Sequence, residues 1–169
     1  NERWQKVGRA FENTYVRFET VTNIGAWRDL HRHRMLTQQR QNFTCSNGYD
    51  VPPEIEESGL SGEFCSAINR LEDLFLKIET QDSNLSQYCC SLAHRIRFMQ
   101  WENLRECFWE MELRTIPEGH PDYRDIEQHK FELLDEGTAL ITEHMLVNMG
   151  HYDFARRGQE EKIKRKQDK

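Results

Sequence analysis

Two short segments with strand-like alternation, set among longer helical patterns, most constrain how this chain can fold. Residues 10–22 are rich in aromatic and β-branched side chains with approximate alternation. In residues 94–102, Ile96, Phe98 and Gln100 alternate with Arg95, Arg97, Met99 and Trp101. Both patterns predict strands. Most of the other patterned segments have helical spacing, so the sequence predicts a helix-rich α+β fold.

Five segments predict helices. Asn23 is suited to cap a helix that begins at Ile24 and points Ile24, Ala26, Trp27 and Leu30 inward. A helix from Ser61 carries a broad apolar stripe that is typical of a core element. Shorter helices are expected over 85–90 and 103–114. A long one is expected from about residue 122 to 148, with an excess of apolar residues such as an oligomer interface would have.

Between these elements, residues 34–53 lose periodicity and predict a loop, and 115–121 contain two prolines and a glycine that break the pattern. The length of 169 residues suits one domain. We therefore expect a single domain over residues 1–155, with a charged C-terminal tail over 156–169.

Several classes of protein are disfavoured by composition. No stretch approaches the roughly 20 apolar residues of a membrane span, and the first residues do not resemble a secretory signal, so neither feature is expected. The five cysteines are scattered and odd in number, without a C-x-x-C pair, which argues against a disulfide framework or a zinc site. His31 and His33 lie two apart, which points them away from each other in a helix and argues against a shared metal. A cytoplasmic protein without a metal is the expectation.

Charge is strongly segregated within the net value of −6. Residues 1–42 carry eight basic and four acidic side chains, whereas residues 43–155 carry 8 and 22. The basic residues of the first segment concentrate in one cluster: Arg28, His31, Arg32, His33, Arg34 and Arg40. A compact cluster in an acidic protein suits a small anionic ligand such as a phosphate better than it suits nucleic acid.

The densest part of that cluster is Arg32-His33-Arg34. Arginine offers planar, bidentate donors to phosphate, so this triplet could hold an anionic ligand. The alternative is that these cations simply offset the dipole at the end of a helix.

A second group of polar residues follows the second strand. Asn103, Cys107, Glu110 and Arg114 fall on one helical stripe that could lie along an extended ligand such as a dinucleotide. The alternative is a solvated face with an internal Glu110–Arg114 pair. His120 stands in a rigid Gly-His-Pro turn and suits a structural role, and the vicinal Cys89 and Cys90 suit buried packing better than catalysis.

Taken in order, these pieces resemble the flavin-dependent thymidylate synthases over residues 8–150. The triplet at 32–34 matches the family's Arg-His-Arg signature, and Ala10-Phe11-Glu12 resembles its Pro-Phe-Glu-His segment. Asn103-Leu104-Arg105 resembles the family's Asn-x-Arg, and Leu113-Arg114 its Leu-Arg. His120 lies near the family's histidine, with one extra residue between it and Arg114.

The resemblance implies a small antiparallel sheet packed with long helices. It also implies reductive methylation of dUMP to dTMP, with FAD as cofactor and methylenetetrahydrofolate and NADPH as co-substrates. Arg114 would engage the uracil as the catalytic residue, and Arg32 would serve both substrate and flavin. The other residues that the resemblance assigns to the cofactor are Glu12, His33, Arg34, Asn103, Arg105 and His120. Family sites are assembled between the subunits of a tetramer, so a homo-oligomer or a partner family-like half is implied.

The sequence departs from the family on the substrate side. Asn42 stands where the signature expects serine, and Arg40, Thr44 and Cys45 replace the glutamate, arginine and tyrosine around it. Gln87 stands where an arginine is expected. The pattern resembles a divergent branch in which two family-like halves can occur in one polypeptide, and it implies a C-terminal half or a copy with a shortened N-terminus.

Three hypotheses follow. The chain is a flavin-dependent thymidylate synthase, or it is a degenerate copy that binds flavin or nucleotide, or only completes an oligomeric site, without turnover. The third is an unrelated helical module that binds anions or RNA through its basic segments.

Overall fold

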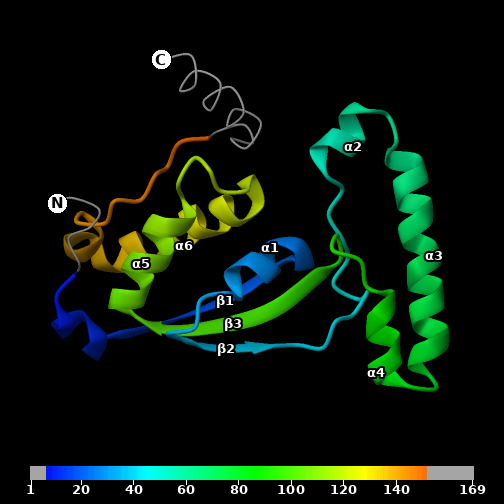
Figure 1. Cartoon of the computed structure of the whole chain (residues 1–169), viewed down its shortest axis with the longest axis horizontal. Coiled ribbons are helices and arrows are strands. Elements are labelled where there is room, and N and C mark those ends of the chain that lie inside the picture. The colour runs from blue at the N-terminus through cyan, green and yellow to red at the C-terminus, as the bar shows by residue number, and fades with distance from the viewer. Residues whose placement is uncertain (1–6, 152–169) are drawn as a thin grey trace, which may run out of the picture. The chain divides into compact units, whose positions relative to one another are not determined.

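The computed structural model describes residues 7–151, which form three strands and a larger number of helices (Figure 1). The predicted α+β fold is confirmed. In chain order the elements are η1 (Arg9–Asn13), β1 (Tyr15–Asn23), α1 (Ile24–Leu30), β2 (Thr37–Arg40), α2 (Pro53–Glu57), α3 (Ser61–Glu79), α4 (Ser83–Ser86), η2 (Gln87–Cys89), β3 (Arg95–Asn103), α5 (Leu104–Arg114) and α6 (Pro121–Thr142). Within the described residues, no helix has the length and apolar content that crossing a membrane requires.

The chain divides into two compact units. Unit 1 contains residues 1–16, 33–36 and 101–169, and unit 2 contains residues 17–32 and 37–100. The single domain predicted over 1–155 stays a prediction, and the charged tail predicted over 156–169 lies outside the described residues.

The sheet is antiparallel and has the order β1-β3-β2, with most of its residues in unit 2. Alternation along β3 places Ile96, Phe98 and Gln100 in the interior, as predicted, and leaves Arg95 and Arg97 exposed. Arg97 pairs with Glu19 of β1. The central strand therefore carries the buried face of the sheet.

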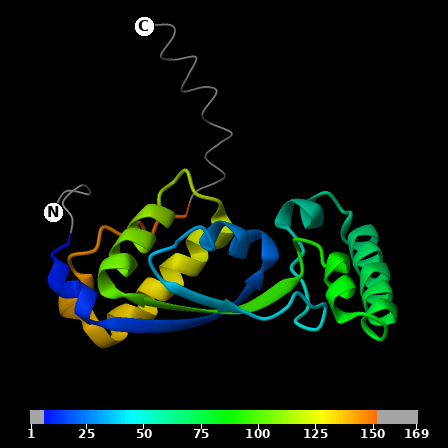
Figure 2. The same ribbon diagram turned by 60° about the horizontal axis from the view of Figure 1, so that its bottom comes forward.

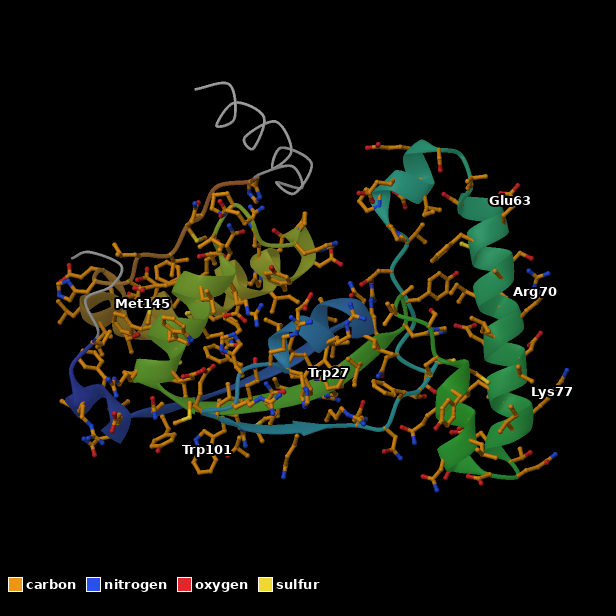
Figure 3. All side chains as sticks on the ribbon, in the orientation of Figure 1. Trp27, Glu63, Arg70, Lys77, Trp101 and Met145 are labelled. Atoms are coloured by element: carbon orange, nitrogen blue, oxygen red, sulfur yellow. The ribbon has the colours of Figure 1, made fainter. Side chains whose placement is uncertain are left out.

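Unit 2 also contains α1 and the α3–α4 pair. The Asn23 side chain accepts a hydrogen bond from Ala26 N (2.8 Å), which confirms the predicted cap, and the four predicted inward residues of α1 are buried. On α3, Glu63, Arg70 and Lys77 recur every seven residues along one exposed side (Figure 3). The opposite side packs against α4, so α3 is a surface helix with one buried face.

In unit 1, α5 and α6 lie side by side, as both views show (Figures 1 and 2). Leu104, Phe108 and Met111 are the apolar face that anchors α5, and the Phe11 ring of η1 packs edge-on against Phe108 (centroids 5.5 Å apart). Trp101, labelled in Figure 3, packs on Tyr15 at the ends of β3 and β1.

Several predicted boundaries were wrong. Residues 10–13 belong to the 3-10 helix η1 rather than to the first strand, and the predicted loop over 34–53 contains β2. The short helix expected over 85–90 is split into α4 and η2. Each of these elements is short, and neighbouring residues in space decide its conformation more than its own pattern does.

The apolar faces of the long helices were also overestimated. In α3 only Ile68 and Phe75 are fully buried, and Leu74, expected on the apolar stripe, is 45% exposed. Helix α6 ends at Thr142, is interrupted by non-helical dihedral angles at Thr138, and buries a largely polar face. Leu140, counted on its apolar face, is 83% exposed.

Candidate functional site

Seven of the eight residues that the sequence singles out belong to unit 1. They are Glu12 on η1, His33 and Arg34 after α1, Asn103, Arg105 and Arg114 on or beside α5, and His120 before α6. The eighth, Arg32, belongs to unit 2, where its Nη2 lies 3.4 Å from Asp29 Oδ1. Arg34 is exposed. Segments far apart in sequence thus contribute to unit 1.

Asn103 sets the start of α5. Its Oδ1 accepts a hydrogen bond from Glu106 N (2.9 Å), so Asn103 is the N-cap and β3 passes directly into α5. This junction puts Arg105 and Glu106 in the first turn and Arg114 in the last turn of one helix. The side chains of a single rigid element therefore span the site.

Arg105 connects α5 to η1. Its Nη1 lies 2.5 Å from Glu12 Oε1, while Arg9 Nη2 lies 3.1 Å from Glu12 Oε2. Hydrogen bonds from Arg9 and from Arg105 lower the pKa of Glu12 from its ordinary value. Glu12 is thus an ionised carboxylate at neutral pH that holds the Arg105 side chain.

His33 is held from both sides by residues of α5. Its Nδ1 lies 3.2 Å from Glu106 Oε1, and its Nε2 lies 2.9 Å from Arg114 Nε. The His33 side chain is only 4% exposed and that of Glu106 11%. The middle residue of the Arg-His-Arg triplet is therefore packed onto α5, with its two ring nitrogens engaged by the two ends of that helix.

The turn before α6 lies against the same arginine. The Arg114 guanidinium lies over the Tyr123 ring (5.3 Å to the centroid), and a Cβ added at Gly119 would lie 3.0 Å from Arg114 O. His120 caps α6, accepting from Asp122 N at Nδ1 (3.3 Å). This observed contact is structural, and a cofactor role for His120 stays a prediction.

The middle of the polar stripe expected along α5 is buried. Cys107 and Glu110 are fully buried, so the alternative of a solvated face along this stripe is wrong. Glu110 Oε2 lies 3.1 Å from Lys130 Nζ of α6. Lys130 also lies 3.3 Å from Glu102 Oε1 and 3.1 Å from Glu127 Oε1. We call these four residues the Lys130 cluster.

Burial strongly perturbs the Lys130 cluster. Desolvation raises the pKa of Glu102 to about 9 and that of Glu127 to about 8. Burial alone would lower the pKa of Lys130, but the three carboxylates outweigh it and raise that pKa well above its ordinary value. The cluster therefore holds an ammonium group and protonated carboxyl groups at neutral pH.

The residues that depart from the family motif lie in unit 2. The Arg40 guanidinium lies over Phe43 and Trp27 (4.4 and 5.4 Å to the centroids). Asn42 is exposed, and Phe43 N donates to Gln87 Oε1 (3.1 Å). Two of the substituted positions thus support the conformation of this segment.

The cysteines near this segment are not poised as nucleophiles. Cys45 Sγ lies 3.9 Å from Cys90 Sγ, and burial raises the pKa of Cys45 to about 12. Burial also raises the pKa of Cys90, and Cys89 is buried. The expectation that the vicinal pair packs rather than reacts agrees with these surroundings.

Sequence reasoning missed Glu106 and Lys130. Glu106 stands three residues after the N-cap Asn103, the spacing of a capping box, and that signal alone would direct its carboxylate back toward Asn103 N. In the structure the Glu106 carboxylate contacts His33 Nδ1 instead. Lys130 carries no local signal, because the three carboxylates around it come from β3, α5 and α6.

Comparison with known proteins adds independent information. Residues 4–137 match the family model described as thymidylate synthase complementing protein. The chain is 37% identical over 157 residues to UPF0159 protein Ta1429 of Thermoplasma acidophilum, covering 91% of this chain and 32% of that protein. It is 35% identical over 124 residues to a UPF0159 protein of Chlamydia muridarum, covering 73% and 23%. The chain thus spans about a third or less of these curated relatives.

The fold is also similar to a solved structure. Thymidylate Synthase X from Helicobacter pylori, crystallised with FAD and dUMP, superposes with a TM-score of 0.65 at 18% identity, covering 82% of this chain and 76% of that one. That likeness concerns the fold alone. Because the family model covers most of the sequence, including the triplet and α5, this chain belongs to the thymidylate synthase complementing protein family.

Proposed function

We propose that this chain is a flavin-dependent thymidylate synthase unit that carries out reductive methylation of dUMP to dTMP. One observation carries the proposal: the motif residues of three distant segments touch one another in unit 1. Glu12 of η1 contacts Arg105, and His33 contacts Arg114, so the family's motifs meet along α5. Membership of the family and the fold shared with an FAD- and dUMP-bound protein support it.

The donor set of unit 1 is compatible with FAD. Arg34, Arg105 and Arg114 supply three guanidinium groups, of which Arg34 is exposed and Arg105 is 35% exposed. Such donors suit the diphosphate and the polar edge of a flavin. We therefore propose that six residues hold the cofactor: Glu12, His33, Arg34, Asn103, Arg105 and His120.

When bound and reduced by NADPH, FAD would supply the hydride for a one-carbon unit that methylenetetrahydrofolate provides. The protein's own part would be positioning and charge stabilisation, since Cys89 and Cys107 are buried and burial raises the pKa of Cys45 to about 12. Arg114, backed by Tyr123 and His33, would bind the uracil and stabilise negative charge that develops on it. The resemblance also assigns Arg32 to substrate and flavin binding, and that role stays a prediction.

A specific observation favours a second candidate, a family copy that binds flavin or nucleotide without turnover. The substituted positions are engaged within unit 2, where Arg40 stacks on Phe43 and Gln87 accepts from Phe43 N. These contacts hold the segment in a conformation that does not depend on a substrate phosphate. Such a copy would complete a site with a partner half or with other subunits of a tetramer.

Single-turnover chemistry distinguishes the two candidates. The purified chain loaded with FAD is reduced anaerobically with dithionite and mixed with dUMP and methylenetetrahydrofolate, and dTMP is measured by chromatography. Formation of dTMP together with flavin reoxidation is expected. Tight binding of FAD and dUMP without formation of dTMP would support the second candidate, a copy that binds without turnover.

A further inference from the structure

We propose that Glu106 is a positioning residue, which fixes the tautomer of His33 and, through His33, the orientation of Arg114. The functional consequence of this inference rests on the proposed function, but its structural content does not. Neither the Arg-His-Arg signature nor the Asn-x-Arg pattern includes Glu106, which follows Arg105 directly on α5.

The hydrogen-bond chemistry of the three groups allows one assignment. A guanidinium group only donates, so Arg114 Nε–H, 2.9 Å from His33 Nε2, requires a lone pair on Nε2. The His33 proton must then be on Nδ1, where the Glu106 carboxylate, 3.2 Å away, accepts it. His33 is thus neutral and protonated at Nδ1, and each of its nitrogens has a suitable partner.

Burial of His33 and Glu106 makes their hydrogen bond hard to replace. The His33 side chain is 4% exposed and that of Glu106 11%, so water cannot readily replace either partner. A carboxylate at Nδ1–H holds the ring in one tautomer and strengthens Nε2 as an acceptor. Arg114 Nε–H donates to this acceptor, and the Arg114 guanidinium lies over the Tyr123 ring. These two contacts together fix the orientation of the guanidinium plane.

Glu106 is suited to this role by its place in the fold. The Asn103 cap fixes the backbone of Glu106 through a hydrogen bond to its N–H, and the first turn of a helix favours a carboxylate. Glu106 and Arg114 lie on the same helix, so their separation is set by α5. Only His33, from a different segment, has to dock between them.

Nuclear magnetic resonance of the isotope-labelled full chain tests the assignment without any ligand. Long-range nitrogen–proton correlations report the tautomer of His33, and hydrogen exchange reports the protection of Arg114 Nε–H. We expect the Nδ1–H tautomer in the wild type. Glu106→Leu removes the acceptor and should speed exchange at Arg114 Nε by about tenfold, whereas Glu106→Gln retains an acceptor oxygen and should preserve both signals.

The chain offers a matched control. Glu132 Oε2 lies 3.3 Å from His129 Nδ1, the same kind of contact on an exposed face of α6. Glu132→Leu should leave His33, Arg114 and dUMP affinity unchanged. For dUMP binding to the FAD-loaded protein, Glu106→Leu should weaken affinity by about tenfold, and Glu106→Gln should restore most of it.

A wild-type His33 that carries its proton on Nε2, or on both nitrogens, would overturn the inference. So would a Glu106→Leu variant in which tautomer and Arg114 exchange are unchanged, or one that shifts both but keeps wild-type dUMP affinity. If Glu106→Leu does not fold, the same measurements on Glu106→Ala, together with the His33 tautomer of the wild type, decide whether Glu106 is a positioning residue. If the wild type binds no dUMP, the proposed function fails while the ligand-free measurements still decide the role of Glu106.

Discussion

Arg114 lies in the last turn of α5 with its guanidinium against His33 and Tyr123. Arg114→Ala should lower the affinity for dUMP by about tenfold to a hundredfold, because a hydrogen bond to a charged group is worth about 1.5–3 kcal/mol. The fold should persist, since Arg114 is only half-buried. Titration calorimetry measures the affinity, and thermal melting checks the fold. Arg70→Ala on the exposed side of α3 is the control, and unchanged dUMP affinity in Arg114→Ala would refute the assignment.

Gly119 is required by close approach in the turn beside Arg114. A Cβ there would lie 2.9 Å from Tyr123 Cε2 and from Arg124 Cγ, and 3.0 Å from Arg114 O. Gly119→Ala should therefore destabilise the protein by about 1–3 kcal/mol, measured by urea unfolding. Gly62→Ala in α3, where nothing lies within 4 Å, should be neutral or slightly stabilising. Equal stability of the two variants would contradict this account of the turn.

At this scale the sequence singled out candidate site residues but not the contacts that they make, and their roles stay predictions. Arg114, Arg105 and His33 could be singled out because arginine and histidine beside motif residues imply anion chemistry. Their partners could not, because Glu106 and Tyr123 reach them only through tertiary packing. A side chain's hydrogen-bond partner depends on which distant segment docks against it, and local patterns do not encode that.

Helices α5 and α6 meet through charge rather than through an apolar seam alone. Lys130 of α6 lies among Glu102, Glu110 and Glu127, and all four side chains are almost completely buried. Helical periodicity predicted α5 correctly but assigned Glu110 to a possible solvated face. Helical periodicity places a charged residue such as Glu110 on the exposed face. The buried partner, Lys130, lies twenty residues later in the sequence, and a local pattern does not reveal that contact.

The Lys130 cluster predicts a pH dependence of stability. The folded pKa values of Glu127 (about 8) and Glu102 (about 9) exceed the unfolded value of 4.5, so the folded state binds more protons above pH 4.5. Their contribution is complete below about pH 4.5 and is lost as the pH rises through about 8 to 9. The free energy of unfolding from urea titrations should thus fall by a few kcal/mol, roughly, between pH 6 and 9.

Substitution of one carboxyl isolates this effect. Glu127→Gln mimics the protonated state and should flatten the decline between pH 6 and 9. Glu132→Gln, on the exposed face of the same helix, should leave the decline unchanged. A wild type whose stability is constant or rises over this interval would show that the cluster does not hold its protons as described.

For the whole molecule, the strand and helix pattern predicted the α+β class, while the grouping of the elements into two units lay beyond it. Periodicity predicts which residues of an element are buried, but it does not predict which other elements those residues pack against. The net charge of −6 describes the acidic majority of the chain, and the basic triplet is divided, with Arg32 in one unit and His33 and Arg34 in the other. The chain spans about a third or less of the curated relatives that it matches.

The visible spectrum of the purified chain after incubation with FAD and removal of free cofactor tests the flavin site most directly. The account predicts flavin absorbance that remains with the protein at near-stoichiometric ratio, and that falls in Arg105→Ala because Arg105 is proposed to hold the cofactor. Arg70→Ala should retain full absorbance. A wild-type chain that is folded by circular dichroism yet retains no FAD would contradict the central claim.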